Sequence, residues 1–132
     1  MGSNMIDSHL SFEANLADGF VTVLGAGMWS AERTEAHFRE LERTVLKIRR
    51  EHGSVRVLVD LREASVQTAE TAAVMREWTT RIYRVADRVA VVCATALLAL
   101  QIKRAADATT LATFHEIEPA IAWIGPAVAK RA

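Results

Sequence analysis

The first apolar pattern along the chain is that of two paired strands. Between residues 10 and 16 every second side chain is apolar and the intervening ones are polar, which predicts a strand with one buried face. The Asp-Gly pair at 18–19 tolerates the backbone of a tight turn, and residues 20–24 are β-branched or apolar. The sequence therefore predicts an antiparallel hairpin, which Gly25 and Gly27 would end.

A second spacing, with apolar residues three and four positions apart, predicts amphipathic helices. The first helix follows Ser30, a helix-capping residue, and ends at Gly53. Its buried stripe is Phe38, Leu41, Val45 and Ile48. The second helix follows Thr68. Its stripe is Met75, Trp78, Ile82 and Val85. A third helix, over residues 96–106, is apolar nearly all round in its early turns, and a short fourth begins at Pro119.

Three apolar runs between these helices predict buried strands at residues 55–61, 89–93 and 111–114. Strands that alternate with helices favour right-handed β-α-β units. We therefore expect an α/β fold with a mixed, mostly parallel five-stranded sheet, an N-terminal antiparallel hairpin and about four helices. One domain should span residues 6–132, and residues 1–5 should be a remnant of cloning or a disordered start.

Composition narrows the functional classes. Hydrophobic residues make up 51% of the 132-residue chain, which excludes a disordered chain. Sixteen basic residues balance sixteen acidic ones, so a general positive field that would attract nucleic acid is absent. Cys93 is the only cysteine, which fits a cytoplasmic protein. Charged residues interrupt the longest apolar run, at 86–100, and a membrane span is not expected.

Residues that could carry catalysis or bind metal are scattered along the chain. The four histidines fall on different predicted elements, with His37 and His52 expected on or beside the wet face of the first helix. Cys93 has neither a basic residue nor a histidine at a motif spacing, and no G-x-S-x-G sequence occurs. We therefore expect no catalytic residue, no metal and no cofactor, and a protein that is not an enzyme.

The segment from Gly25 to Ser30 has the outline of a dinucleotide-binding turn, because it follows a strand and precedes a helix. Asp60, at the end of the next strand, stands in the role of a ribose-binding acid. Against this, Ser30 replaces the third glycine of the motif, Asp60 lies beyond the usual spacing, and the bulky Trp29 crowds the turn. Nucleotide binding through Gly25 and Gly27 remains an alternative.

The stretch that enters the second helix is rich in hydroxyl groups. A phosphate on Ser65, Thr68 or Thr71 would lie near the positive end of that helix and could reorder the loop. In the simpler interpretation Thr68 caps the helix and Ser65 completes a turn. The candidate regulatory loop comprises Ser65, Thr68, Glu70 and Thr71.

Two further surfaces are candidates for binding. The outward positions of the second helix offer a mixed, mainly basic face to another protein. These positions are Arg76, Glu77, Arg81 and Arg84. A cleft between the sheet and the second and third helices could hold a small apolar ligand against tryptophan rings. Its candidate residues are Trp29, Asp60, Trp78 and Leu98.

From residue 12 to residue 123 the chain resembles the STAS fold of sulfate-transporter and anti-sigma-antagonist domains, particularly the SpoIIAA-like group of small bacterial proteins. The resemblance rests on the opening hairpin, residues 57–61 and 88–92, and the closing segment 114–124. In anti-sigma antagonists a partner kinase phosphorylates a serine of an Asp-Ser-Ser-Gly motif. The corresponding residues here, 68–71, contain no serine; Thr68 and Thr71 are the nearest substitutes, and Glu70 adds a permanent negative charge.

The resemblance implies a non-catalytic module that acts in protein–protein interaction or regulation. Its partner would be another protein or a second copy of the chain. Related proteins are grouped with lipid-binding Sec14-type folds, which implies the alternative of a binder of a small apolar or lipid-like ligand. Helix three, apolar on most sides, fits either deep burial or a dimer face.

Overall fold

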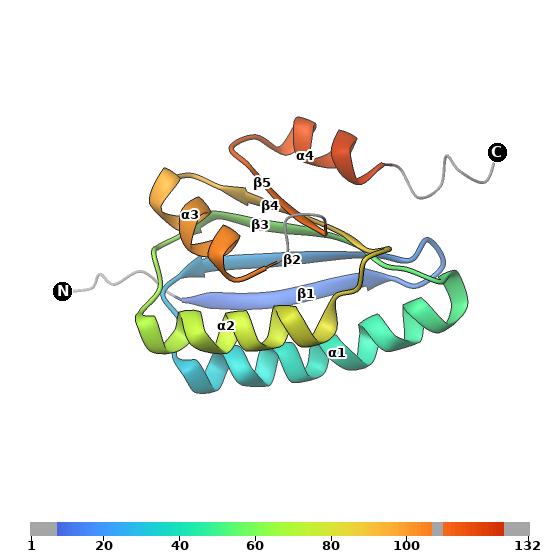
Figure 1. Cartoon of the computed structure of the whole chain (residues 1–132), viewed down its shortest axis with the longest axis horizontal. Coiled ribbons are helices and arrows are strands. Elements are labelled where there is room, and N and C mark those ends of the chain that lie inside the picture. The colour runs from blue at the N-terminus through green and yellow to red at the C-terminus, as the bar shows by residue number, and fades with distance from the viewer. Residues whose placement is uncertain (1–7, 107–109, 126–132) are drawn as a thin grey trace.

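Five strands lie side by side in the order in which they occur in the chain, β1-β2-β3-β4-β5 (Figure 1). The structure is a computed structural model and describes residues 8–106 and 110–125. The strands are β1 (His9–Asn15), β2 (Phe20–Gly27), β3 (Arg56–Ala64), β4 (Arg88–Cys93) and β5 (Leu111–Phe114). The helices are α1 (Ala31–His52), α2 (Ala69–Ile82), α3 (Ala96–Arg104) and α4 (Ile117–Ile124).

The pairing of the strands confirms the predicted fold class. β1 and β2 are antiparallel, with Asn15 opposite Phe20, and the pairs β2–β3, β3–β4 and β4–β5 are parallel. Each parallel connection contributes one helix, and right-handed crossovers that all advance in the same direction place their helices on the same face of a sheet. α1, α2 and α3 accordingly pack on one face, while α4 packs on the other (Figure 1).

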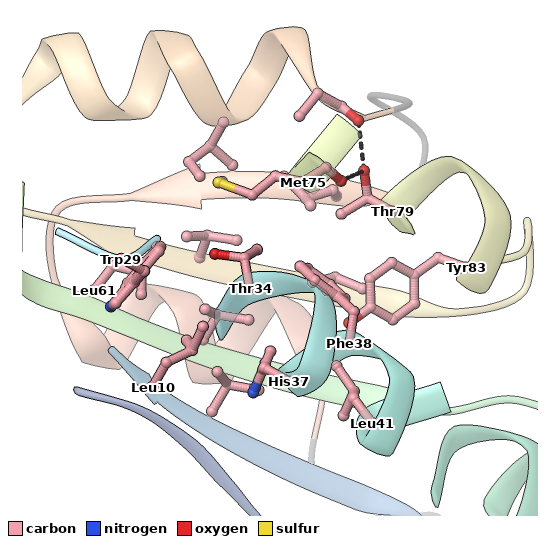
Figure 2. Close-up of a pocket in the computed structure, with 17 residues that line it drawn as sticks. Leu10, Trp29, Thr34, His37, Phe38, Leu41, Leu61, Met75, Thr79 and Tyr83 are labelled. Carbon is pink, nitrogen blue, oxygen red and sulfur yellow. Dashed lines mark hydrogen bonds between the residues drawn. The ribbon is translucent and has the colours of Figure 1, made fainter. Parts of the chain in front are cut away.

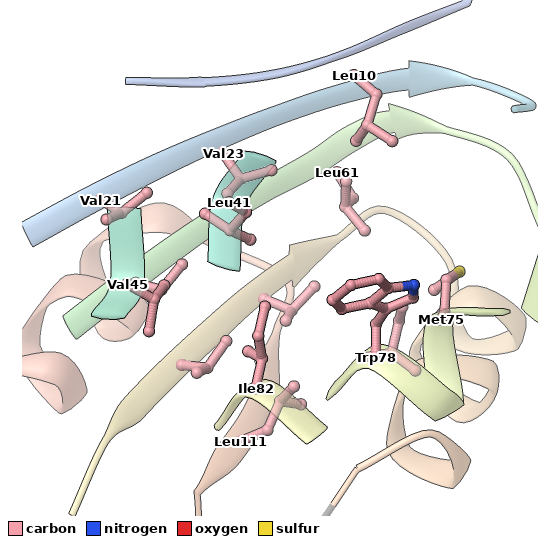
Figure 3. Packing of buried hydrophobic residues seen from close by; sticks show 14 of the residues in the cluster. Leu10, Val21, Val23, Leu41, Val45, Leu61, Met75, Trp78, Ile82 and Leu111 are labelled. Atoms are coloured by element: carbon pink, nitrogen blue, oxygen red, sulfur yellow. The ribbon is translucent and has the colours of Figure 1, made fainter. Parts of the chain in front are cut away.

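Side chains along the central strands point alternately to the two faces of the sheet, so the core has two parts. In β3, Val57 and Leu61 point towards α1, α2 and α3, whereas Leu58 points towards α4. The first part is a large cluster in which Leu41 and Val45 of α1 meet the sheet (Figure 3). The second part is a small cluster beneath α4. Most of the apolar burial therefore lies on one face.

Three predicted helix signals, Ser30, Thr68 and Gly53, are confirmed, whereas α4 begins at Ile117, two residues before its predicted start at Pro119. The Ser30 hydroxyl accepts a hydrogen bond from the backbone N–H of Arg33 at 3.0 Å, and the Thr68 hydroxyl accepts one from Thr71 at 3.2 Å. Gly53 ends α1 with φ at +83°, a conformation that favours glycine.

Several predicted boundaries are wrong. The second strand does not end at Gly25 but continues to Gly27, the last residue of β2, and Ala26 and Gly27 pair with Glu63 and Ala64. The same pairing carries β3 to residue 64, three residues past its predicted end, because ladder hydrogen bonds form regardless of side-chain polarity. The prediction for residues 1–5 lies outside the described residues.

α2 and α3 are both shorter than their apolar patterns predicted. α2 ends at Ile82 because Tyr83 is extended, so Val85 does not join the buried stripe and is 82% exposed. α3 ends at Arg104. Its Leu98 and Ile102 are buried in the large cluster, but Leu97 is 67% and Leu100 44% exposed. The apolar character of α3 therefore includes a partly exposed face.

Candidate functional site

A buried glutamine fixes the loop between β3 and α2. The side chain of Gln67 accepts a hydrogen bond from the backbone N–H of Trp29 at 2.9 Å and donates to the carbonyls of Gly27 at 3.0 Å and Ser65 at 2.6 Å. Its backbone N–H donates to the side-chain oxygen of Gln101, and the Gln101 amide donates back to the Gln67 carbonyl, both at 2.9 Å. The loop is thus tied to β2, to the start of α1 and to α3.

The residues of the candidate regulatory loop differ in how far they are buried. Ser65, Thr68 and Glu70 are exposed, whereas Thr71 is 1% exposed. The Thr71 hydroxyl donates to the Trp29 carbonyl at 2.9 Å, so a phosphate at that oxygen would remove a buried hydrogen bond. Thr71 is therefore inaccessible in the folded chain, and Ser65 and Thr68 are the exposed hydroxyl residues of this loop.

Gly25, in β2 shortly before α1, makes room for an indole ring. A Cβ atom on Gly25 would lie 2.7 Å from both Trp29 and Leu61, closer than side-chain atoms pack. The Trp29 ring nitrogen donates to the carbonyls of His9 at 2.8 Å and Ala26 at 3.0 Å. The backbone N–H of Trp29, which could otherwise face a phosphate, is bonded to Gln67.

Topology adds a second reason against the nucleotide hypothesis. In open α/β sheets, ligands bind at the carboxyl ends of strands where crossovers diverge to opposite faces. Here the helices α1, α2 and α3, which connect the parallel strands, share one face of the sheet. The described strands therefore form no such crevice, and this geometry does not support nucleotide binding through Gly25 and Gly27.

The four residues of the predicted apolar cleft do not share one site. Trp29, Trp78 and Leu98 are buried on the face of α1, α2 and α3. Asp60 follows the orientation of Leu58 and lies on the α4 face, because alternate strand residues point the same way. Arg62 donates to its carboxylate at 2.8 and 2.9 Å, and these hydrogen bonds hold the pKa of Asp60 below its ordinary value.

A small apolar cavity of about 60 Å³ does lie between α1, α2 and the sheet (Figure 2). Trp29 lines this cavity, together with Phe38, Met75 and Tyr83, but Trp78 and Leu98 lie outside its lining. A dry cavity of roughly 150 Å³ is needed for a molecule such as benzene. This cavity therefore has no room for an acyl chain unless the helices move.

His37 lies in the wall of this cavity, and its expected place on or beside the wet face of α1 is wrong. The imidazole packs edge-on against Phe12 and Phe38, with ring centroids 5.8 and 5.3 Å away. Burial, followed by the charge of Arg33, lowers the pKa of His37 to about 4. The ring is consequently neutral at pH 7 and serves as an apolar wall.

The remaining candidate for a reactive side chain, Cys93, has the surroundings of a core residue. Cys93 is buried, and burial raises the pKa of its thiol to about 11, so the reactive thiolate is disfavoured at neutral pH. Within residues 8–106 and 110–125, no three histidine, cysteine or acidic side chains group closely enough to hold a metal ion. None of the helices in these ranges has the length and apolarity needed to cross a membrane.

A surface groove of about 310 Å³ lies between α2 and α3. We call it the α2–α3 groove. Its apolar side chains are Val66, Ala69, Ala72, Leu97, Leu100 and Ala105. Arg76 of α2 and Arg104 of α3 also line it. The sequence pattern indicates Arg76 as a surface residue but does not indicate the groove, because the apolar side chains of α3 fit either burial or a dimer face.

The residues of the predicted, mainly basic face of α2 lie in different surroundings. Arg76 lines the α2–α3 groove, while Glu77 is exposed. Arg81 lies on the α1 side, with its guanidinium 4.3 Å from the centre of the Trp78 ring and 3.6 Å from Glu42. Arg84 is exposed but lies beyond the end of the helix. The four side chains therefore have different surroundings, and Arg76 is the one that lines the groove.

Fold and site together define a small α/β module of the STAS type. The SpoIIAA-like family profile matches residues 26–125, so the chain belongs to the SpoIIAA-like family. Among solved structures it is similar to an uncharacterised protein of the DUF3478 family with a SpoIIAA-like fold from Shewanella loihica PV-4. The two share 20% identity with a TM-score of 0.64, over 95% of this chain and 99% of the other. The search of curated proteins gave no match.

Proposed function

We propose that this protein is a non-catalytic regulatory module that binds a partner protein in the α2–α3 groove. The observation that carries the proposal is the exposure of three neighbouring apolar side chains that line the groove. Val66 is 40%, Leu100 44% and Leu97 67% exposed. Apolar side chains that gather in a surface groove are typical of protein interaction sites.

The chemistry of the groove indicates an amphipathic helical segment as the occupant. Such a segment can place apolar side chains at i, i+3 and i+4 into a groove formed by two helices. Arg76 and Arg104 would pair with acidic residues that flank the apolar stripe, and arginine binds carboxylates through paired hydrogen bonds. The partner that fits is therefore acidic and amphipathic.

The position of the groove next to the loop supports a regulatory role. Val66 belongs both to the groove and to the loop that Gln67 fixes, and Gln101 of α3 lines the groove while bonding Gln67. A partner in the groove would thus contact the segment that carries Ser65 and Thr68. A single buried cysteine is consistent with the cytoplasm as the compartment.

The test is a selection from a displayed library of helical peptides, followed by affinity measurements on purified protein. We expect selected peptides to carry acidic residues beside an apolar stripe and to shift backbone NMR signals of α2 and α3. Leu97→Glu should weaken their binding by about tenfold or more, because it places a charge in the apolar groove.

Leu46→Glu is the matched control, because Leu46 is an exposed leucine, 42% accessible, on α1. It should leave peptide affinity unchanged. Equal losses in the two variants, or NMR shifts confined to another surface, would overturn the proposal. A ligand-sized mass retained by the protein in native mass spectrometry would instead favour the small apolar ligand.

A further inference from the structure

We propose that the outer edge of β1 is a second interaction surface, which pairs in antiparallel fashion with β1 of a second copy of this chain. β1 is the first strand of the sheet, and among the described residues its one strand neighbour is β2 (Figure 1). An edge strand presents unpaired backbone groups that can extend the sheet into another chain.

One hydrogen bond shows which backbone groups face outward. Arg33 of α1 donates from its guanidinium to the Leu10 carbonyl at 3.0 Å. Because backbone groups of a strand alternate between its two sides, Phe12 and Ala14 present their N–H and C=O groups to the same side as Leu10. A carbonyl oxygen has two lone pairs, so Leu10 can accept from a strand and from Arg33 together.

Side chains along β1 suit pairing about a two-fold axis at Phe12. In that register Leu10 lies opposite Ala14 of the second copy, and the exposed Ser11 lies opposite Glu13. Like charges therefore do not face each other, and a hydroxyl is placed beside a carboxylate. Like charges directly opposite would destabilise a strand pair, whereas this arrangement is favourable.

The charges beside the edge of β1 favour a second copy of this chain, rather than an unrelated strand, as the partner. A groove of about 270 Å³ separates β1 from α1, and both Arg33 and Glu40 line it. These residues are two helical turns apart, so the groove is positive near Leu10 and negative further along. A two-fold axis reverses the direction of the groove, which brings Arg33 of each copy towards Glu40 of the other.

The expected dimer is weak and concentration-dependent. Stable interfaces bury roughly 1,200–2,000 Å², and strands of seven residues provide little area beyond the backbone pairing. The α2–α3 groove involves neither β1 nor the face of α1 beside it. Dimerisation would therefore leave two grooves free, and a partner with two binding segments would be held more tightly than one with a single segment.

Sedimentation velocity over a range of protein concentrations tests this proposal. We expect a monomer–dimer equilibrium that Glu40→Arg weakens by about tenfold, since each symmetric contact then joins two arginines. Arg33→Glu should weaken it similarly. The double variant R33E/E40R should restore it, because the charges are exchanged but remain complementary.

Glu35→Arg is the matched control, because it makes the same charge change on α1 at a residue that pairs with Arg39 outside the groove. It should leave the equilibrium unchanged. Hydrogen exchange at Phe12 and Ala14 should slow as protein concentration rises. A chain that stays monomeric, a double variant without rescue, or a dimer that Leu97→Glu dissociates would overturn the proposal.

Discussion

The two faces of the sheet differ in how completely they are covered. On the side of α1, α2 and α3 the described chain buries a cluster of twenty residues, whereas the cluster beneath α4 contains five. α4 contacts β3, β4 and β5. On β2, Thr22 and Leu24 of that same face are exposed. The difference indicates that one face holds the fold together while the other is only partly closed.

The largest expected effect concerns Asp87, a buried acid on the face of the sheet that α1, α2 and α3 cover, which we call the well-covered face. Asp87 is 1% exposed and accepts hydrogen bonds from the backbone of Val55 at 2.9 Å and Arg84 at 2.8 Å, and from the Arg49 guanidinium. Asp87→Ala would leave a partly buried cation and two N–H groups without their acceptor. We expect a loss of about 3–5 kcal/mol in the free energy of unfolding, measured by urea denaturation.

Asp18→Ala provides the comparison for that measurement. Asp18 is half-buried, and among the described residues its hydrogen bonds join Asn15 alone in the hairpin turn. Its removal should cost less than about 1 kcal/mol. Similar losses in the two variants would show that the Asp87 hydrogen bonds do not stabilise the well-covered face.

The second prediction compares the same substitution on the two faces. Ile48 of α1 is 1% exposed and Ile124 of α4 is 2% exposed, so both are buried. Ile48→Ala should cost about 2–5 kcal/mol, because the dense cluster around it cannot collapse into the cavity. Ile124→Ala should cost less, because the few residues around it can relax.

Hydrogen exchange distinguishes the two variants further. Ile124→Ala should accelerate exchange in α4 while the strands remain protected, since α4 would open locally. Ile48→Ala should accelerate exchange throughout the sheet. If both variants lost stability equally and exchanged alike, the two faces would form one cooperative unit and the comparison would fail.

The third prediction, with the smallest expected effect, is a loss of stability at mildly acidic pH that is caused by His37. Its pKa is about 4 in the folded chain and 6.5 when unperturbed, so the unfolded chain binds the extra proton first. Stability should therefore be fully present above pH 6.5 and fall as the pH drops towards 4. The full loss is about 3 kcal/mol, and part of it is reached at pH 5.

His37→Leu should remove this pH dependence, measured as the free energy of unfolding between pH 7 and pH 5. His9→Gln, at an exposed histidine, is the matched control and should retain the slope of the unaltered protein. A slope that persists in His37→Leu would assign the acid sensitivity to other groups.

Local patterns were sufficient for most of the fold. The spacing of apolar residues located the helices and strands, and Ser30, Thr68 and Gly53 cap helices as predicted. The errors arose where neighbouring segments overrode local preference. Strand pairing carried β2 and β3 through glycines and charged residues, and the extended backbone at Tyr83 ended α2 before its apolar pattern did.

The candidate sites were harder to predict than the fold. Asp60 was grouped with Trp29 and Trp78, although alternation in β3 places it on the opposite face of the sheet. Gln67 has no distinguishing sequence signal, since an isolated glutamine in a polar loop normally faces solvent. Its importance follows from hydrogen bonds to segments 38 and 40 residues before it and 34 residues after it in the chain.

The sequence by itself determined the element order, the mixed sheet, the capped helices and the resemblance to the SpoIIAA-like family, because periodicity and capping depend on neighbouring residues. Only the tertiary structure decided that Thr71 and His37 are buried, that Leu97 and Leu100 form a groove with α2, and that β1 is an edge strand of the described sheet. These properties depend on which distant segments of the chain pack together. The burial of a residue follows from that packing and not from the residue type alone.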